Sequence, residues 1–181
     1  NLQMAEQIAV SSKCGRPGVC NAIENMIVDS SIAERFLPSV AKKFQEEGCE
    51  LWVDDRAGDI LNDFEKKIAN DNDYAEEFLD LRLAIKVVDT LDEAIAFVNR
   101  FGSGHSESII TSNKSRAETF LNKVDASSVY WNASTRFTDG FEFGLGAEIG
   151  ISTDRLHARG PMGLEELCTY KYQIIGDGQW K

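Results

Sequence analysis

The chain has 181 residues and a formal net charge of −11 at pH 7, and 43% of its residues are hydrophobic. This composition indicates a globular domain with a sizeable core, and the acidic balance argues against a protein that binds nucleic acid or an anionic membrane. No apolar run is long enough to span a bilayer. The four cysteines form no Cys-x-x-Cys pair, so we expect no metal site, and their scattered spacing favours reduced thiols in the cytoplasm.

Strands and helices are predicted to alternate along the first 131 residues. A short amphipathic helix is expected over 1–10, and residues 54–73 form an acidic surface helix and loop. Three further helices are expected: one capped by Ser30 or Ser31 and ended by Gly48, one begun by Asp92 and Glu93 and closed at Gly102, and one over 114–124. The expected strands are 26–28, 50–53, 83–88, 108–111 and 127–131. This alternation predicts an α/β fold, with a parallel sheet covered by helices on both faces.

The pattern changes after residue 131. Residues 132–162 are rich in glycine, and we expect irregular chain with one or two short strands, which is typical of ligand sites in open α/β sheets. A short helix is expected over 163–169, followed by a strand over 170–175 that could pair with a partner's sheet edge. We therefore expect one domain over 1–169, and a C-terminal strand and tail over 170–181 as an oligomerisation element.

Cys20 stands at the end of a bend. Pro17 fixes φ and Gly18 permits positive φ or close backbone approach, and the residues from Ala22 onward predict a turn of helix that runs into a strand. The thiol would then lie where free backbone N–H groups could stabilise a thiolate and later an oxyanion. The alternative is an inert, buried cysteine, and the local sequence leaves both interpretations open.

Four residues of the glycine-rich segment and its surroundings are candidates for binding an anionic ligand. Arg136, His157 and Arg159 are suited to phosphate or carboxylate, although each arginine could instead pair with a surface carboxylate and the histidine could belong to the core. Asn132 follows a strand, and it either positions a ligand or forms a turn. His105 lies in a turn that begins Gly-Ser-Gly, and we expect it to be structural or to support residues that contact the ligand without contacting it itself.

Three runs of sequence carry a resemblance to a known family. They are Arg16–Glu24 (RPGVCNAIE), Trp131–Gly140 (WNASTRFTDG) and Gly144–Leu167. They closely resemble the gamma-glutamyl phosphate reductases, a family of the aldehyde dehydrogenase superfamily. The resemblance extends over nearly the whole of this chain but over only the C-terminal part of the family's chain. It implies the parallel-sheet catalytic domain of the aldehyde dehydrogenase-like fold, with Cys20 as the catalytic nucleophile.

The resemblance also implies a reaction. It is the NADPH-dependent reduction of L-glutamyl 5-phosphate to L-glutamate 5-semialdehyde and phosphate, through a thioester on Cys20, in proline biosynthesis. Glu77, in a Glu-Glu-Phe segment, is similar to a residue that contacts the nicotinamide ribose in aldehyde dehydrogenases, but Leu79-Asp80 replaces the Gly-Pro that usually follows, and a surface turn is the alternative. No Gly-x-Gly-x-x-Gly follows a strand. Most NADPH contacts are therefore expected in the family's other half, and this chain alone should fold but be inactive.

Two alternatives stand beside this interpretation. One is the reductase part of a bifunctional pyrroline-5-carboxylate synthase, and the other is a catalytically silent remnant that serves in oligomerisation. The motif around Cys20 is more similar to the stand-alone reductase, and the intact runs around Cys20 and Arg136 argue against a remnant. In either enzymatic case we expect a small-molecule substrate and a homo-oligomer.

Overall fold

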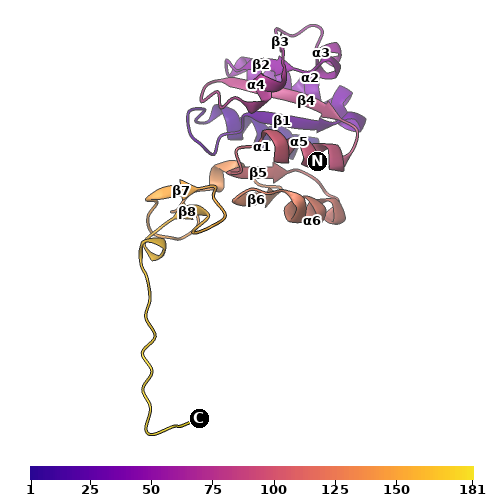
Figure 1. The fold of residues 1–181 in the computed structure, drawn as a ribbon. Helices are drawn as coiled ribbons and strands as arrows, with labels where there is room; N and C mark the ends of the chain where they lie inside the picture. Colours follow the sequence, from indigo (N-terminus) through magenta and orange to yellow (C-terminus); the bar gives the residue numbers. More distant parts are fainter.

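A four-stranded parallel sheet lies at the centre of the upper part of the molecule, and the computed structural model describes all residues from 1 to 181 (Figure 1). The strands stand in the order β3-β2-β4-β1, and every neighbouring pair is parallel. They are β1 (Asn25–Asp29), β2 (Glu50–Val53), β3 (Lys67–Ile68) and β4 (Arg82–Val88). The predicted α/β class with a parallel sheet is confirmed.

The central strand, β4, is covered on both faces. Leu83 and Ile85 belong to the main core together with the apolar stripe of α2, and α1 packs against the same core. Ala84 points to the other face, where it packs with Tyr74 of α4 and Phe97 of α5. Because side chains alternate along a strand, this division means that helices cover both faces, as predicted. These helices are α1 (Leu2–Cys14), α2 (Ser30–Glu46), α4 (Asp71–Ala75) and α5 (Leu91–Phe101).

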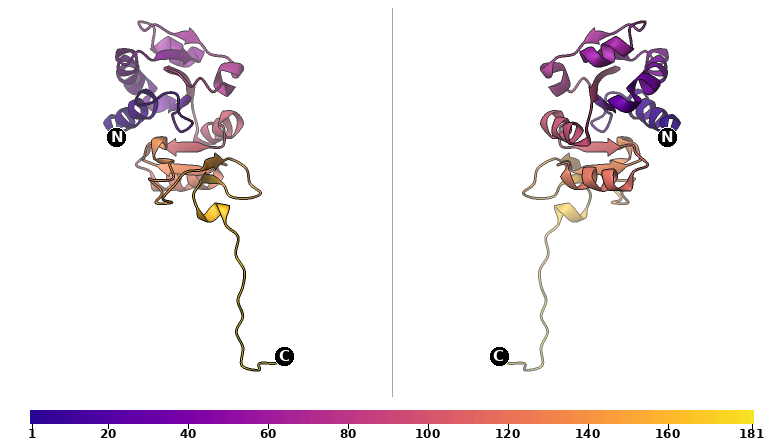
Figure 2. Two further views of the ribbon diagram at one scale, coloured as in Figure 1. Left: turned by 90° about the vertical axis from the view of Figure 1, so that its left-hand side faces the viewer. Right: turned by 90° about the vertical axis from the view of Figure 1, so that its right-hand side faces the viewer.

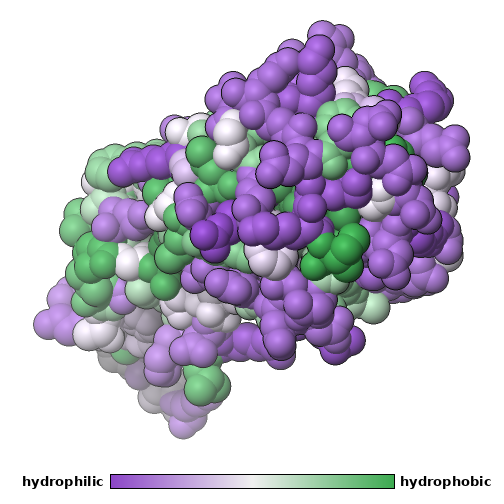
Figure 3. Space-filling view, turned by 90° about the horizontal axis from the view of Figure 1, so that it is seen from above, coloured by the Kyte–Doolittle hydropathy of each residue, from purple (hydrophilic) through white to green (hydrophobic).

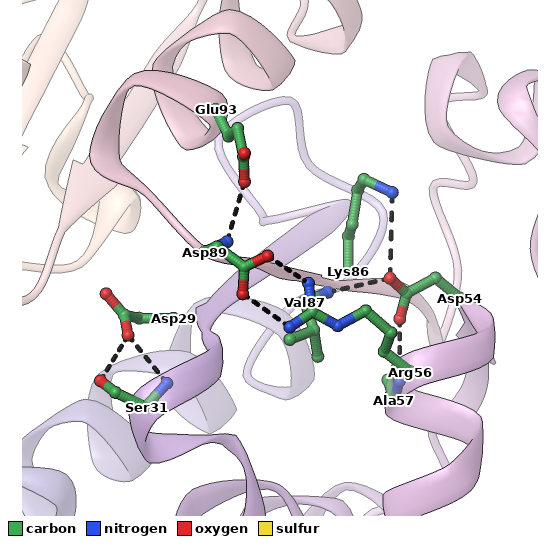
Figure 4. A network of polar contacts seen from close by, with 9 residues as sticks. All are labelled: Asp29, Ser31, Asp54, Arg56, Ala57, Lys86, Val87, Asp89 and Glu93. Carbon is green, nitrogen blue, oxygen red and sulfur yellow. Dashed lines mark hydrogen bonds and ion pairs between the residues drawn. The ribbon is translucent and has the colours of Figure 1, made fainter.

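Carboxylates organise the edge of the sheet at which β1, β2 and β4 end (Figure 4). Asp29 accepts a hydrogen bond from Ser31 N at 3.0 Å and caps α2, so the predicted serine cap was wrong by one or two residues. Asp54 accepts from Ala57 N at 2.9 Å, which caps α3 (Asp55–Ile60), and also from Val87 N at 3.2 Å. The oxygens at this edge are thus used to terminate strands and start helices.

A second, smaller parallel sheet lies below the first and contains β5 (Ser106–Ile109) and β6 (Ser128–Trp131), joined by α6 (Lys114–Lys123). Phe120 and Val124 pack there against Ile95 and Val98 of α5. β5 lies two residues before its predicted range. β1 and β5 are not hydrogen-bonded to each other, and a groove of about 550 Å³ is lined by both strands and by α1.

The remainder is irregular, as predicted. Two short antiparallel strands, β7 (Gly150–Ser152) and β8 (Gly160–Met162), form a hairpin, and the helix expected over 163–169 is only a 3₁₀ turn, Glu165–Leu167. The strand expected over 170–175 is absent. These residues form an extended tail that leaves the body in every view and makes no backbone hydrogen bond to the rest of the chain (Figures 1 and 2).

Polar residues cover most of the face seen from above, with apolar residues in separate patches between them (Figure 3). The helices are too short and too polar for any of them to cross a bilayer.

Candidate active site

The loop that carries Cys20 connects the end of α1 to the start of β1. It is held by backbone hydrogen bonds from Ala22 N to Val19 O at 3.0 Å and from Ile23 N to Ser12 O at 3.2 Å. The expected turn of helix before β1 is not formed, and these residues make a tight bend instead. Cys20 is exposed and lines the groove between the two sheets. The bend therefore presents the thiol to the groove at the amino end of the sheet.

A buried ion pair clamps the two ends of this loop. Lys13 is entirely buried, and its Nζ lies 2.6 Å from Oε2 of Glu24, whose side chain is only 16% exposed. The other oxygen of Glu24 accepts a hydrogen bond from Leu79 N at 3.3 Å, so the clamp also holds the segment before β4. Burial raises the pKa of Glu24, and Lys13 offsets only part of this effect. Sequence reasoning missed this pair because a lysine in the last turn of a helix is ordinarily solvated.

Asn21 joins the Cys20 loop to the segment that follows β6. Its buried side chain donates to Thr138 O at 2.9 Å and to Arg136 O at 3.3 Å, and its Oδ1 accepts from the Arg136 guanidinium. Its own carbonyl accepts from Thr135 Oγ1 at 2.6 Å. Two runs that are more than a hundred residues apart in sequence thus meet behind Cys20.

The charges around Cys20 do not favour a thiolate in the free chain. Partial burial raises the pKa of the Cys20 thiol, and the carboxylates of Glu148 and Glu77 raise it further. The backbone N–H of Cys20 itself and the guanidinium of Arg136 oppose them. Backbone donors therefore contribute here, as expected, but burial and the two carboxylates outweigh them and Arg136, so that the pKa of the thiol is raised.

The structure does not bring the other candidate anion binders to Cys20. Arg159 donates to Asp125 at 2.8 Å and lines a separate cavity of about 210 Å³. His157 is exposed in the loop between β7 and β8, where its ring makes no hydrogen bond. Asn132 adopts φ 56° at the carboxyl end of β6, and its amide group bonds twice to the backbone of Thr111. Glu77, in contrast, lines the same groove as Cys20.

Comparison with known proteins shows which protein family this chain resembles. The model for the aldehyde dehydrogenase family matches residues 82–171. Gamma-glutamyl phosphate reductases from Persephonella marina and Enterococcus faecalis are 55% and 56% identical over 99% and 98% of this chain, which spans 42% of either relative.

Solved structures agree with the sequence relatives. The gamma-glutamyl phosphate reductase of Thermotoga maritima superposes with a TM-score of 0.95 at 46% identity over the whole chain, which covers 43% of that protein. An indole-3-acetaldehyde dehydrogenase in complex with NAD+, at 22% identity and a TM-score of 0.58 over 74% of this chain and 36% of its own, shares the fold. By sequence and by structure, the chain therefore belongs to the aldehyde dehydrogenase family and resembles its gamma-glutamyl phosphate reductases over nearly its whole length.

Proposed function

We propose that this chain carries the nucleophile and part of the substrate site of an NADPH-dependent gamma-glutamyl phosphate reductase. The observation that supports this most is the set of hydrogen bonds between Arg136 and Asn21, the residue after Cys20, since it unites in space two of the three sequence runs that resemble the family. The bifunctional synthase has no specific support, because the relatives reported above are named gamma-glutamyl phosphate reductase.

The proposed reaction uses Cys20 in two steps. Its thiolate attacks the γ-carbonyl carbon of the acyl phosphate, and the bond from that carbon to the phosphate oxygen breaks, so that phosphate leaves with the electron pair and a thioester remains. When bound, NADPH supplies the hydride that reduces this thioester. Cys20 then leaves as the thiolate and releases the semialdehyde. Splitting the reduction in this way replaces one difficult step by two easier ones.

Glu77 is the residue of this chain that would contact the cofactor. Its side chain is exposed and lines the groove together with Cys20, so a ribose whose hydroxyls donate to the carboxylate would lie beside the thiol. The groove thus fits one end of a dinucleotide, and the rest of its binding site is proposed to lie in the part of the family's enzyme that this chain does not span.

Trapping the thioester tests the proposed function. A full-length enzyme that contains this chain is incubated with glutamate 5-semialdehyde and NADP+ without phosphate, and its peptides are weighed by mass spectrometry. We expect a γ-glutamyl adduct on Cys20 that accumulates until phosphate is added and releases it as the acyl phosphate. An adduct on another residue, or turnover that does not depend on phosphate, would contradict the proposal.

Replacing Arg136 by alanine should weaken the binding of anionic substrate. The guanidinium is the cation whose charge acts on Cys20, and a lost charged hydrogen bond is worth about 1.5–3 kcal/mol, so KM for the acyl phosphate or for phosphate should rise roughly tenfold or more. Arg159→Ala is the matched control, because Asp125 already holds that guanidinium away from the groove. Steady-state kinetics of both variants decide, and a larger KM effect in Arg159→Ala would reverse the assignment.

The tail over 170–181 is proposed to join two copies of the chain. Tyr170, Tyr172, Ile174 and Ile175 are each at least 80% exposed in the single chain, although they have the composition of a strand. Paired with the sheet of a second copy, they would lose this exposure and gain backbone hydrogen bonds. Sedimentation of the chain with and without residues 170–181 tests this, since a tail that is not involved would leave the association unchanged.

A further inference from the structure

A line of hydrogen bonds leads from the interior of the lower sheet to the Cys20 loop. It begins at His105, which is only 6% exposed and directly precedes β5. Nδ1 of His105 lies 2.6 Å from Ser106 Oγ, and this hydroxyl donates to Thr138 Oγ1 at 2.6 Å. The carbonyl oxygen of Thr138 accepts from the side chain of Asn21, the residue after Cys20. Ser106 and Thr138 therefore connect a buried imidazole to Asn21, the neighbour of the proposed nucleophile.

The direction of these bonds assigns the proton on the imidazole. The Ser106 hydroxyl has one proton and gives it to Thr138, so it accepts from His105, and Nδ1 carries the hydrogen. Burial lowers the pKa of His105, which keeps the ring neutral at neutral pH against the charges of Glu148 and Glu77. Nε2 is consequently unprotonated, and it is buried without any hydrogen-bond partner. The ring is thus engaged through Nδ1 alone.

We propose that His105 is a positioning residue for Cys20, acting through Ser106 and Thr138 on the segment that holds Asn21. Thr138 is 1% exposed, and its hydroxyl also lies 2.7 Å from the hydroxyl of Tyr130, so the segment is fixed from two strands of the lower sheet. These side-chain bonds fix the position of the Thr138 carbonyl, which Asn21 contacts. A shift of this carbonyl would move Asn21, and with it the thiol relative to a bound acyl group.

The inference rests on the proposed role of Cys20 as the nucleophile, and two substitutions at one position test it. Asn in place of His105 puts an amide N–H near the former Nδ1, whereas Gln puts it near the former Nε2. In a full-length enzyme that contains this chain, we expect H105N to keep kcat within about threefold of the unsubstituted value. H105Q should lose about tenfold in kcat, the kinetic equivalent of one lost hydrogen bond, while KM changes less than about twofold.

The reactivity of Cys20 supplies a readout that does not depend on turnover. In the 181-residue chain, iodoacetamide labelling of Cys20 is followed by peptide mass spectrometry between pH 7 and pH 10. Because partial burial is the largest cause of the raised thiol pKa, a loosened loop should lower the apparent pKa in H105Q and speed labelling at pH 7.5, although kcat falls. A mere loss of active protein would slow turnover without shifting this titration.

Two further variants keep the test decisive if His105 variants do not fold. S106A removes the middle link and T138V removes the hydroxyl while leaving the carbonyl in the chain, so both should reproduce the H105Q pattern. The proposal is overturned if these variants match the unsubstituted protein, or if H105Q is active and H105N is not, since Nε2 would then be the working atom. Retention of turnover in C20S would instead overturn the proposed function, so the two failures are distinguishable.

Discussion

Replacing Cys20 by serine in a full-length enzyme that contains this chain is expected to lower turnover at least about a thousandfold in both directions. A serine hydroxyl ionises far less readily than a thiol, and the surroundings of Cys20 already disfavour an anion, since partial burial and two carboxylates raise the pKa of the thiol. No side chain stands in hydrogen-bond contact with the sulfur to act as a general base for the hydroxyl. NADPH oxidation with the acyl phosphate, and phosphate-dependent reduction of NADP+ with the semialdehyde, measure the loss.

Cys168→Ser is the matched control, because Cys168 is also an exposed thiol and lies outside the groove. It should change both rates by less than about twofold, as substitutions away from a site ordinarily do. Equal losses in the two variants would mean that general damage, rather than removal of the nucleophile, explains the result for Cys20.

Lys13→Met is expected to lower the free energy of unfolding by about 3 kcal/mol, within the range measured when one partner of a buried ion pair is removed. The substitution leaves Glu24 buried with its carboxylate facing only the N–H of Leu79. Its pKa, already raised by burial, should rise further, and protonation would relieve part of the cost. Urea unfolding of the 181-residue chain at pH 7 measures the change.

The double variant Lys13→Met/Glu24→Leu should recover most of this loss, because a well-packed apolar pair often replaces a buried ion pair without cost. Lys42→Met is the surface control, since Lys42 and Glu46 are 72% and 61% exposed and their pair should contribute less than about 0.5 kcal/mol. If Lys13→Met were no more destabilising than Lys42→Met, the loop would be held by its backbone hydrogen bonds instead of the clamp.

The elements of the fold were predictable where one periodic pattern dominated. The strand over 50–53 was predicted with its observed bounds, because a buried strand between a helix-ending glycine and an acidic turn leaves little freedom. The local sequence did not determine the start of α2, since Asp29, Ser30 and Ser31 can all cap a helix, and only the extended end of β1 selects Asp29. A strand over 170–175 has the right alternation, but pairing needs a neighbour that local sequence does not specify.

The candidate site, like the fold, could be predicted only in part from the sequence. Arg136 and Arg159 were candidates for binding an anion on the same grounds of residue type. The fold holds only Arg136 beside the Cys20 loop, through Asn21, whereas Arg159 lies against Asp125, a contact that depends on how two distant loops fold. Lys13 and His105 could not be ranked from sequence, because their importance comes from complete burial and from single hydrogen-bond partners. Such properties exist only after the chain is packed.

No hydrogen bonds join β1 to β5, so the two sheets meet at a boundary without backbone pairing. The upper sheet and the lower sheet are joined by side-chain packing, such as that of Ile27 against the lower core, and by the loops around Cys20, with no backbone ladder across the groove. Native-state hydrogen exchange should therefore separate the amides into two cooperative units, with β4 opening only on global unfolding and β5–β6 opening earlier. Cys20, the proposed nucleophile, lies where these units meet, so a local opening of the lower unit would disassemble the proposed site before the molecule unfolds.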